Sequence, residues 1–109
     1  LELSSAASDV YKRQFQHHPR PLVRAAACRA LLQLTNDAQF GEELIRLLQH
    51  PEPLVRRGAL LDLGATGWTG ALPAIQDASV EASLKLVALR GLAESSDDST
   101  VLDAMDSLL

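Results

Sequence analysis

Residues His50–Gly64 read HPEPLVRRGALLDLG and decide the fold. Two prolines mark a start, a Val-Arg pair follows, and apolar residues then end on a glycine. The same pattern occurs upstream as HPRPLVRAAACRALL over His18–Leu32, so the two copies begin 32 residues apart, at residues 18 and 50. A fixed period of this size is typical of repeat proteins. The sequence therefore predicts a chain built from repeated units.

A third, more diverged copy lies near the end of the chain. Its Leu84-Lys85 pair matches Val55-Arg56 at an offset of 29 residues, from residue 55 to residue 84. Each copy predicts a helix that is apolar on nearly all sides and therefore packs on more than one side. We expect helices over Leu22–Leu34, Asp37–Gln49, Leu54–Leu63, Gly70–Ala78, Val80–Glu94 and from Asp98 or Ser99 to Leu109, with Gly64 as a left-handed cap of the third.

These helices alternate in character. The helix over 37–49 is amphipathic, whereas its neighbours on either side are apolar almost all round. One such pair cannot bury its own apolar surface, but stacked pairs share a continuous core. The pattern predicts an all-α fold, an α-solenoid (alpha-alpha superhelix) of HEAT-like helix pairs that are shorter than the about 40–47 residues of standard HEAT or armadillo units.

Composition excludes several classes of function. The net charge of −4 argues against non-specific nucleic-acid binding, which requires a basic surface. A single cysteine excludes an internal disulfide and a cysteine-based zinc cluster. No apolar run approaches the roughly 20 residues of a membrane span. We therefore expect a soluble, cytoplasmic protein.

The first residues look foreign to the rest. Ser4–Gln14 reads SSAASDVYKRQ, which looks like the in-frame translation of a common sequencing adapter. We expect residues 1–14 to be a non-native leader and residues 15–109 to form the HEAT-like domain. The alternative is a genuine polar N-terminal helix, with helix-compatible residues over 9–16.

Two stretches carry a more specific resemblance. RRGALLDLGATGW over 56–68 and EASLKLVALRGL over 81–92 resemble the E/F-type phycocyanobilin lyase subunits, which belong to the phycobilisome bilin lyases with HEAT-like repeats. MDSLL over 105–109 resembles the C-terminus of that family. Because family members carry more repeats, the resemblance implies that this chain is a C-terminal fragment of a longer cyanobacterial solenoid.

The resemblance implies a function. The family helps attach a linear tetrapyrrole to a phycobiliprotein cysteine through a thioether, usually as a heterodimer of two lyase subunits. The expected partners are a phycobiliprotein subunit, a partner lyase subunit and the bilin, which is substrate; no cofactor is expected. Two alternatives remain open: a HEAT-like scaffold that binds protein without chemistry, and a factor that detaches or degrades the pigment.

Cations recur at one position of the repeat. Arg24, Arg56 and Lys85 occupy the start of the three apolar helices. They either pair with an acid or a backbone carbonyl and form a structural ladder, or they bind bilin propionates by charge-assisted contacts. Arg57 and Arg90 break the repeat pattern, which adds weight to a site-specific role, but a solvated charge is the favoured interpretation of both.

Trp68 is the only tryptophan and lies in a glycine-flanked connector. It is either a loop anchor that packs on the next repeat or a flat surface for a tetrapyrrole ring. The candidate bilin-binding set is therefore Arg57, Trp68, Lys85, Arg90 and Arg56.

No residue is identified as catalytic. Cys28 is either a small buried hydrophobe or a transient bilin-carrying nucleophile, and the first is favoured because no base lies at helical spacing from it. His17, His18 and His50 stand at proline-interrupted loops and have no carboxylate at ligand spacing, so no metal site is expected.

Overall fold

The computed structural model describes residues 18–95 and 99–109, and every regular element in these ranges is helical. The predicted all-α fold is confirmed, with boundaries that differ by a few residues. The elements are α2 (Pro21–Thr35), α3 (Ala38–Leu47), α4 (Pro53–Thr66), the 3-10 turn η2 (Thr69–Ala71), α5 (Leu72–Asp77), α6 (Ala82–Ser95) and α7 (Ser99–Leu108). The helix considered over residues 9–16 and the capping role of Asp98 lie outside the described residues.

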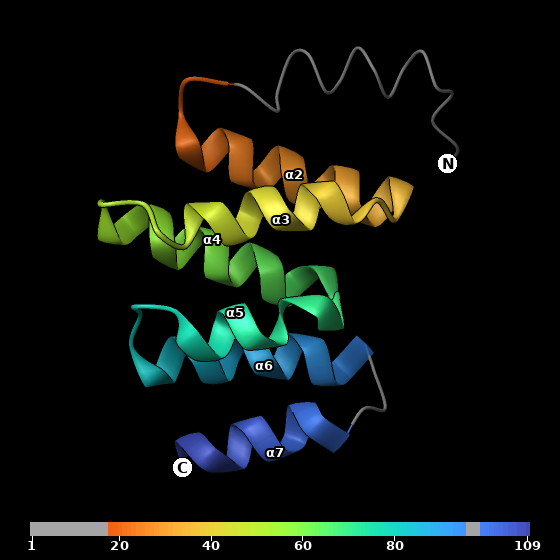
Figure 1. Cartoon of the computed structure of the whole chain (residues 1–109), viewed down its shortest axis with the longest axis vertical. Coiled ribbons are helices and arrows are strands. Elements are labelled where there is room, and N and C mark those ends of the chain that lie inside the picture. Colours follow the sequence, from red (N-terminus) through yellow and green to blue (C-terminus); the bar gives the residue numbers. More distant parts are fainter. Residues whose placement is uncertain (1–17, 96–98) are drawn as a thin grey trace.

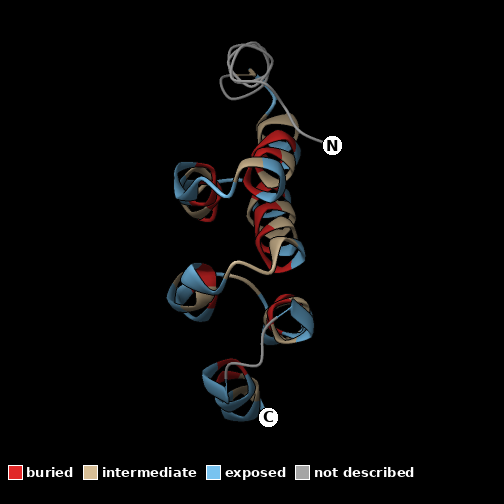
Figure 2. Cartoon of the chain, turned by 90° about the vertical axis from the view of Figure 1, so that its right-hand side faces the viewer, coloured by how far each residue is buried: buried red, intermediate tan, exposed pale blue. Residues whose placement is uncertain are grey.

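The helices form two layers along the molecule (Figure 1). Seen end-on, α2, α4 and α6 stack in one layer, and α3, α5 and α7 lie beside it (Figure 2). Helix α4 packs against both α2 and α6, and α3 packs across α2 and α4. This arrangement confirms the predicted α-solenoid of helix pairs. We call α2, α4 and α6 the inner helices and the others the outer helices.

Repeat-equivalent residues build the core. Cys28, Leu60 and Leu89 occupy one repeat position on successive inner helices, and all three are 0% exposed. The next such position, one turn later, is also filled by fully buried leucines on all three helices. Because each inner helix contributes the same row of side chains, stacking the repeats creates one continuous core.

Histidine fixes the turn before an inner helix. The backbone N–H of Arg20 donates to Nδ1 of His18 at 3.1 Å, and the N–H of Glu52 donates to Nδ1 of His50 at the same distance. The imidazole thus takes the part that an Asn or Asp side chain plays in an Asx turn. Proline follows at the first position of α2 and α4, where its missing N–H costs nothing.

The predicted end of the third helix is wrong. Gly64 does not cap α4, which continues to Thr66 and is capped by Gly67 in the left-handed conformation, with φ 70°. Gly64 is instead buried where α4 crosses α6. A Cβ at Gly64 would lie 2.6 Å from the Cα of Ala88, and one at Gly91 would lie 2.5 Å from the Gly64 carbonyl oxygen. The glycine is required by close helix packing, which a local pattern does not distinguish from capping.

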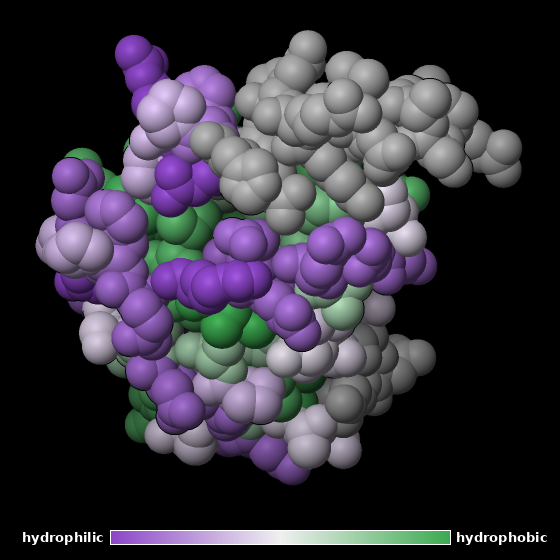
Figure 3. All heavy atoms as spheres, turned by 45° about the horizontal axis from the view of Figure 1, so that its top comes forward, coloured by the Kyte–Doolittle hydropathy of each residue, from purple (hydrophilic) through white to green (hydrophobic). Residues whose placement is uncertain are grey.

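Helix α3 is amphipathic, as predicted. Its first turn is capped by Asp37, whose carboxylate accepts from the N–H of Gln39 at 3.1 Å. Phe40 and Leu44 are fully buried, whereas the polar side chains of the opposite face are largely exposed. The oblique view in Figure 3 shows this hydrophilic surface, with hydrophobic side chains visible between the polar ones. Among the described residues, no helix is long and apolar enough to cross a membrane.

The Gly64 contact yields a test of the fold. Gly64→Ala should lower the free energy of unfolding by about 1–3 kcal/mol despite the higher helix propensity of alanine, because the new methyl group meets the Ala88 backbone. Gly58→Ala on the same helix is the matched control. Its Cβ would meet only the end of the Leu22 side chain, so this change should be neutral or stabilising by up to about 1 kcal/mol. Urea denaturation measures both, and equal effects of the two substitutions would contradict the packing role.

Candidate functional site

The recurring cations bind loop carbonyls. Arg24 Nη1 donates to the His18 carbonyl at 2.8 Å, and Arg56 Nη1 donates to the His50 carbonyl at the same distance. Lys85 Nζ donates to the Gln76 carbonyl at 2.7 Å. These contacts tie each inner helix to the segment that precedes it, which is the ladder considered from the sequence.

Arg56 makes the fullest set of these contacts. Besides His50, it donates to the carbonyls of Pro51 at 2.9 Å and Ser79 at 3.3 Å, so it joins the loop before α4 to the loop before α6. Its guanidinium and the Lys85 ammonium are therefore already engaged by backbone oxygens. A role for either in binding a bilin stays a prediction.

Arg57 and Arg90 are engaged differently. Arg57 forms an ion pair with Glu81 at 2.9 Å, and Arg90 forms one with Glu94 at 3.1 Å. The Arg57 side chain is 42% exposed and that of Arg90 76% exposed. Exposed pairs of this kind contribute little to stability, so both cations can exchange their partner for an external carboxylate at small cost.

Apolar side chains accompany these arginines on the outward side of the inner helices. Leu54 is 67% exposed, Leu61 40% and Val87 54%. Leu61 and Arg90 stand at equivalent repeat positions, 29 residues apart, on α4 and α6, which pack against each other. We call the surface formed by Leu54, Arg57, Leu61, Val87 and Arg90 the inner-helix face. It combines exposed apolar area with guanidinium groups.

Trp68 lies at the other end of α4. About 15 Å of helix separates Arg56 from Thr66 at 1.5 Å per residue, and Trp68 follows that end. The five predicted residues therefore do not converge on one point. They divide into the helix starts, the inner-helix face and the Trp68 end.

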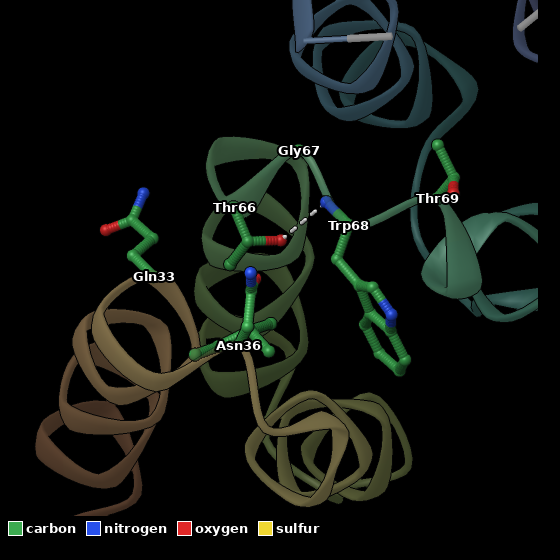
Figure 4. Close-up of a pocket in the computed structure, with 7 residues that line it drawn as sticks. Gln33, Asn36, Thr66, Gly67, Trp68 and Thr69 are labelled. Carbon is green, nitrogen blue, oxygen red and sulfur yellow. Dashed lines mark hydrogen bonds between the residues drawn. The ribbon is translucent and has the colours of Figure 1, made fainter.

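Trp68 both packs and borders a pocket. Its backbone N–H donates to Thr66 Oγ1 at 3.1 Å, and its indole lies against Gly41 of α3, where a Cβ would collide with the ring. The packing role considered from the sequence is thus present, but toward the preceding repeat rather than the next one. The pocket has a volume of about 330 Å³ and is lined by Leu32, Gln33, Asn36, Thr66, Gly67, Trp68 and Thr69 (Figure 4).

Sequence reasoning missed the α2 side of this pocket. Gln33 Nε2 donates to the Ala65 carbonyl at 3.2 Å, across a separation of 32 residues. That separation equals the repeat period, because stacking places equivalent positions of neighbouring repeats in contact. Asn36 caps α2 in the left-handed conformation, as Gly67 caps α4. The repeat offset applied to the Trp68 connector would have pointed to these residues.

Cys28 is placed as a buried hydrophobe. It is 0% exposed, and burial is the main cause that raises the pKa of its thiol from 9.0 to about 11. The thiolate, which is the nucleophilic form, is therefore suppressed at neutral pH. This supports the structural interpretation of Cys28. Among the described residues, no group of three His, Cys, Asp or Glu side chains could hold a metal ion, and His17 lies outside them.

Arg56 and Arg57 are neighbours on α4, and they provide a test that separates a structural cation from an exposed one. Arg56→Met should lower the free energy of unfolding by about 1–2 kcal/mol, because carbonyls in two loops lose a charged donor. Arg57→Met removes an equal charge but only an exposed ion pair, so its effect should stay within about 0.5–1 kcal/mol. Thermal and urea melts of both variants measure the difference. A larger loss for Arg57→Met would contradict this assignment.

The buried thiol predicts a pH effect. Between pH 9 and pH 11 the thiol ionises in the unfolded chain but stays protonated in the folded one, so its contribution to stability is lost as the pH rises. The stability advantage of the parent chain over Cys28→Ala should therefore shrink by about 2 kcal/mol from pH 8 to pH 11. Urea melts of both proteins across this range measure it. An advantage that does not change with pH would contradict the burial of the thiol.

Comparison with known proteins identifies a family and several relatives of this chain. A HEAT-repeat family model matches residues 12–108. The chain is 69% identical over 97 residues to the bilin biosynthesis protein RpcE of Synechococcus sp. (strain WH8020), a match that covers 89% of this chain and 37% of that protein. It is 51% identical over 78 residues to the phycocyanobilin lyase subunit alpha of Thermosynechococcus vestitus, covering 72% of this chain and 28% of the relative.

A solved structure shares the fold. A chain in the complex of CpcE and CpcF of phycocyanin lyase from Nostoc sp. PCC7120 matches with a TM-score of 0.82 and 43% identity, covering 94% of this chain and 41% of that one. The present chain thus spans less than half the length of each of these relatives.

Proposed function

The chain belongs to the HEAT-repeat family, and we propose that it works as part of a bilin lyase subunit, which helps attach a linear tetrapyrrole to a phycobiliprotein cysteine through a thioether. The observation that carries the proposal is the 69% identity to a bilin biosynthesis protein over 89% of this chain. The matches to alpha subunits of phycocyanobilin lyase favour the E-type over the F-type subunit.

The part played by this chain is binding. Its one thiol is buried and protonated, so the nucleophile is the cysteine of the acceptor phycobiliprotein. Holding two reactants in a productive geometry can contribute several kcal/mol to a rate. In this proposal the bilin is the substrate and no cofactor takes part.

The inner-helix face supplies contacts of the right kind. A linear tetrapyrrole is a flat apolar chain of rings with two propionate groups. Leu54, Leu61 and Val87 offer exposed apolar area, and Arg57 and Arg90 can pair with the propionates by charge-assisted hydrogen bonds. The same apolar area can contact a partner lyase subunit, as the CpcE–CpcF complex of the relative suggests.

The proposed site of action of this protein is the cytoplasm.

A chimera tests the function. Residues 15–109 would replace the matching segment of the Synechococcus RpcE, and the chimera would be co-expressed with a partner subunit, a bilin source and a phycobiliprotein α-chain. Covalent colour on the acceptor, read on a denaturing gel, should rise above a control without lyase. A folded chimera that pairs with its partner yet adds no colour would falsify the lyase role and favour the scaffold.

Two further arms sharpen the result. A chimera with Arg57→Met and Arg90→Met should keep partner binding but give less colour, because both propionate partners are lost. Incubation of the unmodified chimera with an already coloured phycobiliprotein tests the remaining alternative. Loss of bound colour in that arm would favour a pigment-detachment factor.

A further inference from the structure

Two helix C-termini meet at the pocket. Helix α2 ends at Thr35 and is capped by Asn36, and α4 ends at Thr66 and is capped by Gly67; Asn36, Thr66 and Gly67 all line the cavity (Figure 4). The last carbonyls of a helix lack intrahelical donors and carry a partial negative charge. The caps engage the carbonyls of Leu32 and Gly64, and Gln33 engages that of Ala65.

The carbonyls of the lining residues Gln33 and Thr66 accept no hydrogen bond from the described residues, so the pocket wall retains acceptors.

The part of the chain that the structure describes places no cation in the last turn of either helix at this pocket. Neither α2 nor α4 has a basic residue in its last turn, whereas α3 has Arg46 there. None of the seven lining residues is charged. Gln33 already donates to one carbonyl of α4, which shows that the wall accepts N–H groups from outside the helix. Such a wall favours an N–H donor and disfavours a carboxylate.

The remaining wall is aromatic and the space is small. The indole of Trp68 is held in place by Gly41 on α3 and by Gly70, where an added Cβ would lie 2.6 Å from the ring. A volume of about 330 Å³ is at the low end for small-molecule sites, so it suits one end of an extended ligand rather than four linked rings.

We infer that this pocket binds a terminal lactam ring of the tetrapyrrole, with the ring N–H directed to the C-terminal carbonyls and the ring plane beside Trp68. The inference rests on the proposed function and adds the orientation of the substrate. Terminal rings of a linear tetrapyrrole carry an N–H and a C=O but no acid, whereas the propionates belong to the two inner rings. The pocket thus selects an end, and the propionates stay outside it.

Trp68 also supplies the readout, because it is the only tryptophan of the chain. The probe is a dipyrrinone, a lactam ring joined to one pyrrole, without any acid group. It should quench Trp68 fluorescence saturably, and the analogue methylated on the lactam nitrogen should bind more weakly because it has lost its donor.

Gln33→Lys is the decisive variant. It places an ammonium group at the carbonyl-rich wall, so dipyrrinone affinity should fall about tenfold, while the helix dipole makes the change neutral or stabilising. Gln49→Lys is the matched control. It adds the same charge after α3, away from the pocket, and should leave the affinity unchanged. A thermal melt of each variant verifies the fold.

The outcomes separate this inference from the lyase proposal. Non-saturable quenching, equal binding of the methylated probe, or equal affinity in Gln33→Lys would overturn the pocket assignment, even if the RpcE chimera colours its acceptor. Selective dipyrrinone binding together with an inactive chimera would uphold the lactam site and overturn the lyase function.

Discussion

The close crossing of α4 and α6 at Gly64 is the constraint on which the inner layer depends. There the backbone of one helix meets the backbone of the next, with Ala88 and Gly91 facing Gly64. Backbones can approach this closely only where side chains are absent or are single methyl groups. The spacing of the layer in turn decides which loop ends lie near one another.

Ties between loops and helices complete this framework. Arg24, Arg56 and Lys85 each bind a backbone carbonyl of the segment before their own helix, and Arg56 also reaches the next repeat. These carbonyls have no helix N–H within reach, so the cationic side chain supplies their hydrogen-bond donor. The cations at the start of each inner helix therefore belong to the architecture, whereas Arg57 and Arg90 remain exposed.

The division between repeated and non-repeated residues carries into function. The Trp68 pocket is lined by residues that differ between the copies. The inner-helix face mixes such residues with repeated ones, because Leu54 matches Leu22 and Arg90 matches Arg29. The chain offers exposed apolar side chains, exposed guanidinium groups and a pocket beside two helix C-termini, and it buries its only thiol. These features suit a protein that holds a reactive pigment for a nucleophile on another chain.

The sequence by itself determined the helical repeat, the alternation of amphipathic and apolar helices, and the burial of Cys28, because hydrophobic periodicity and proline placement act locally. It also singled out Trp68. Only the tertiary structure decided that Gly64 serves packing while Gly67 serves capping, since both roles favour glycine near a helix end. Only stacking brought Gln33 and Asn36 to Trp68, because contacts one repeat apart depend on how neighbouring helices superimpose, which no local pattern specifies.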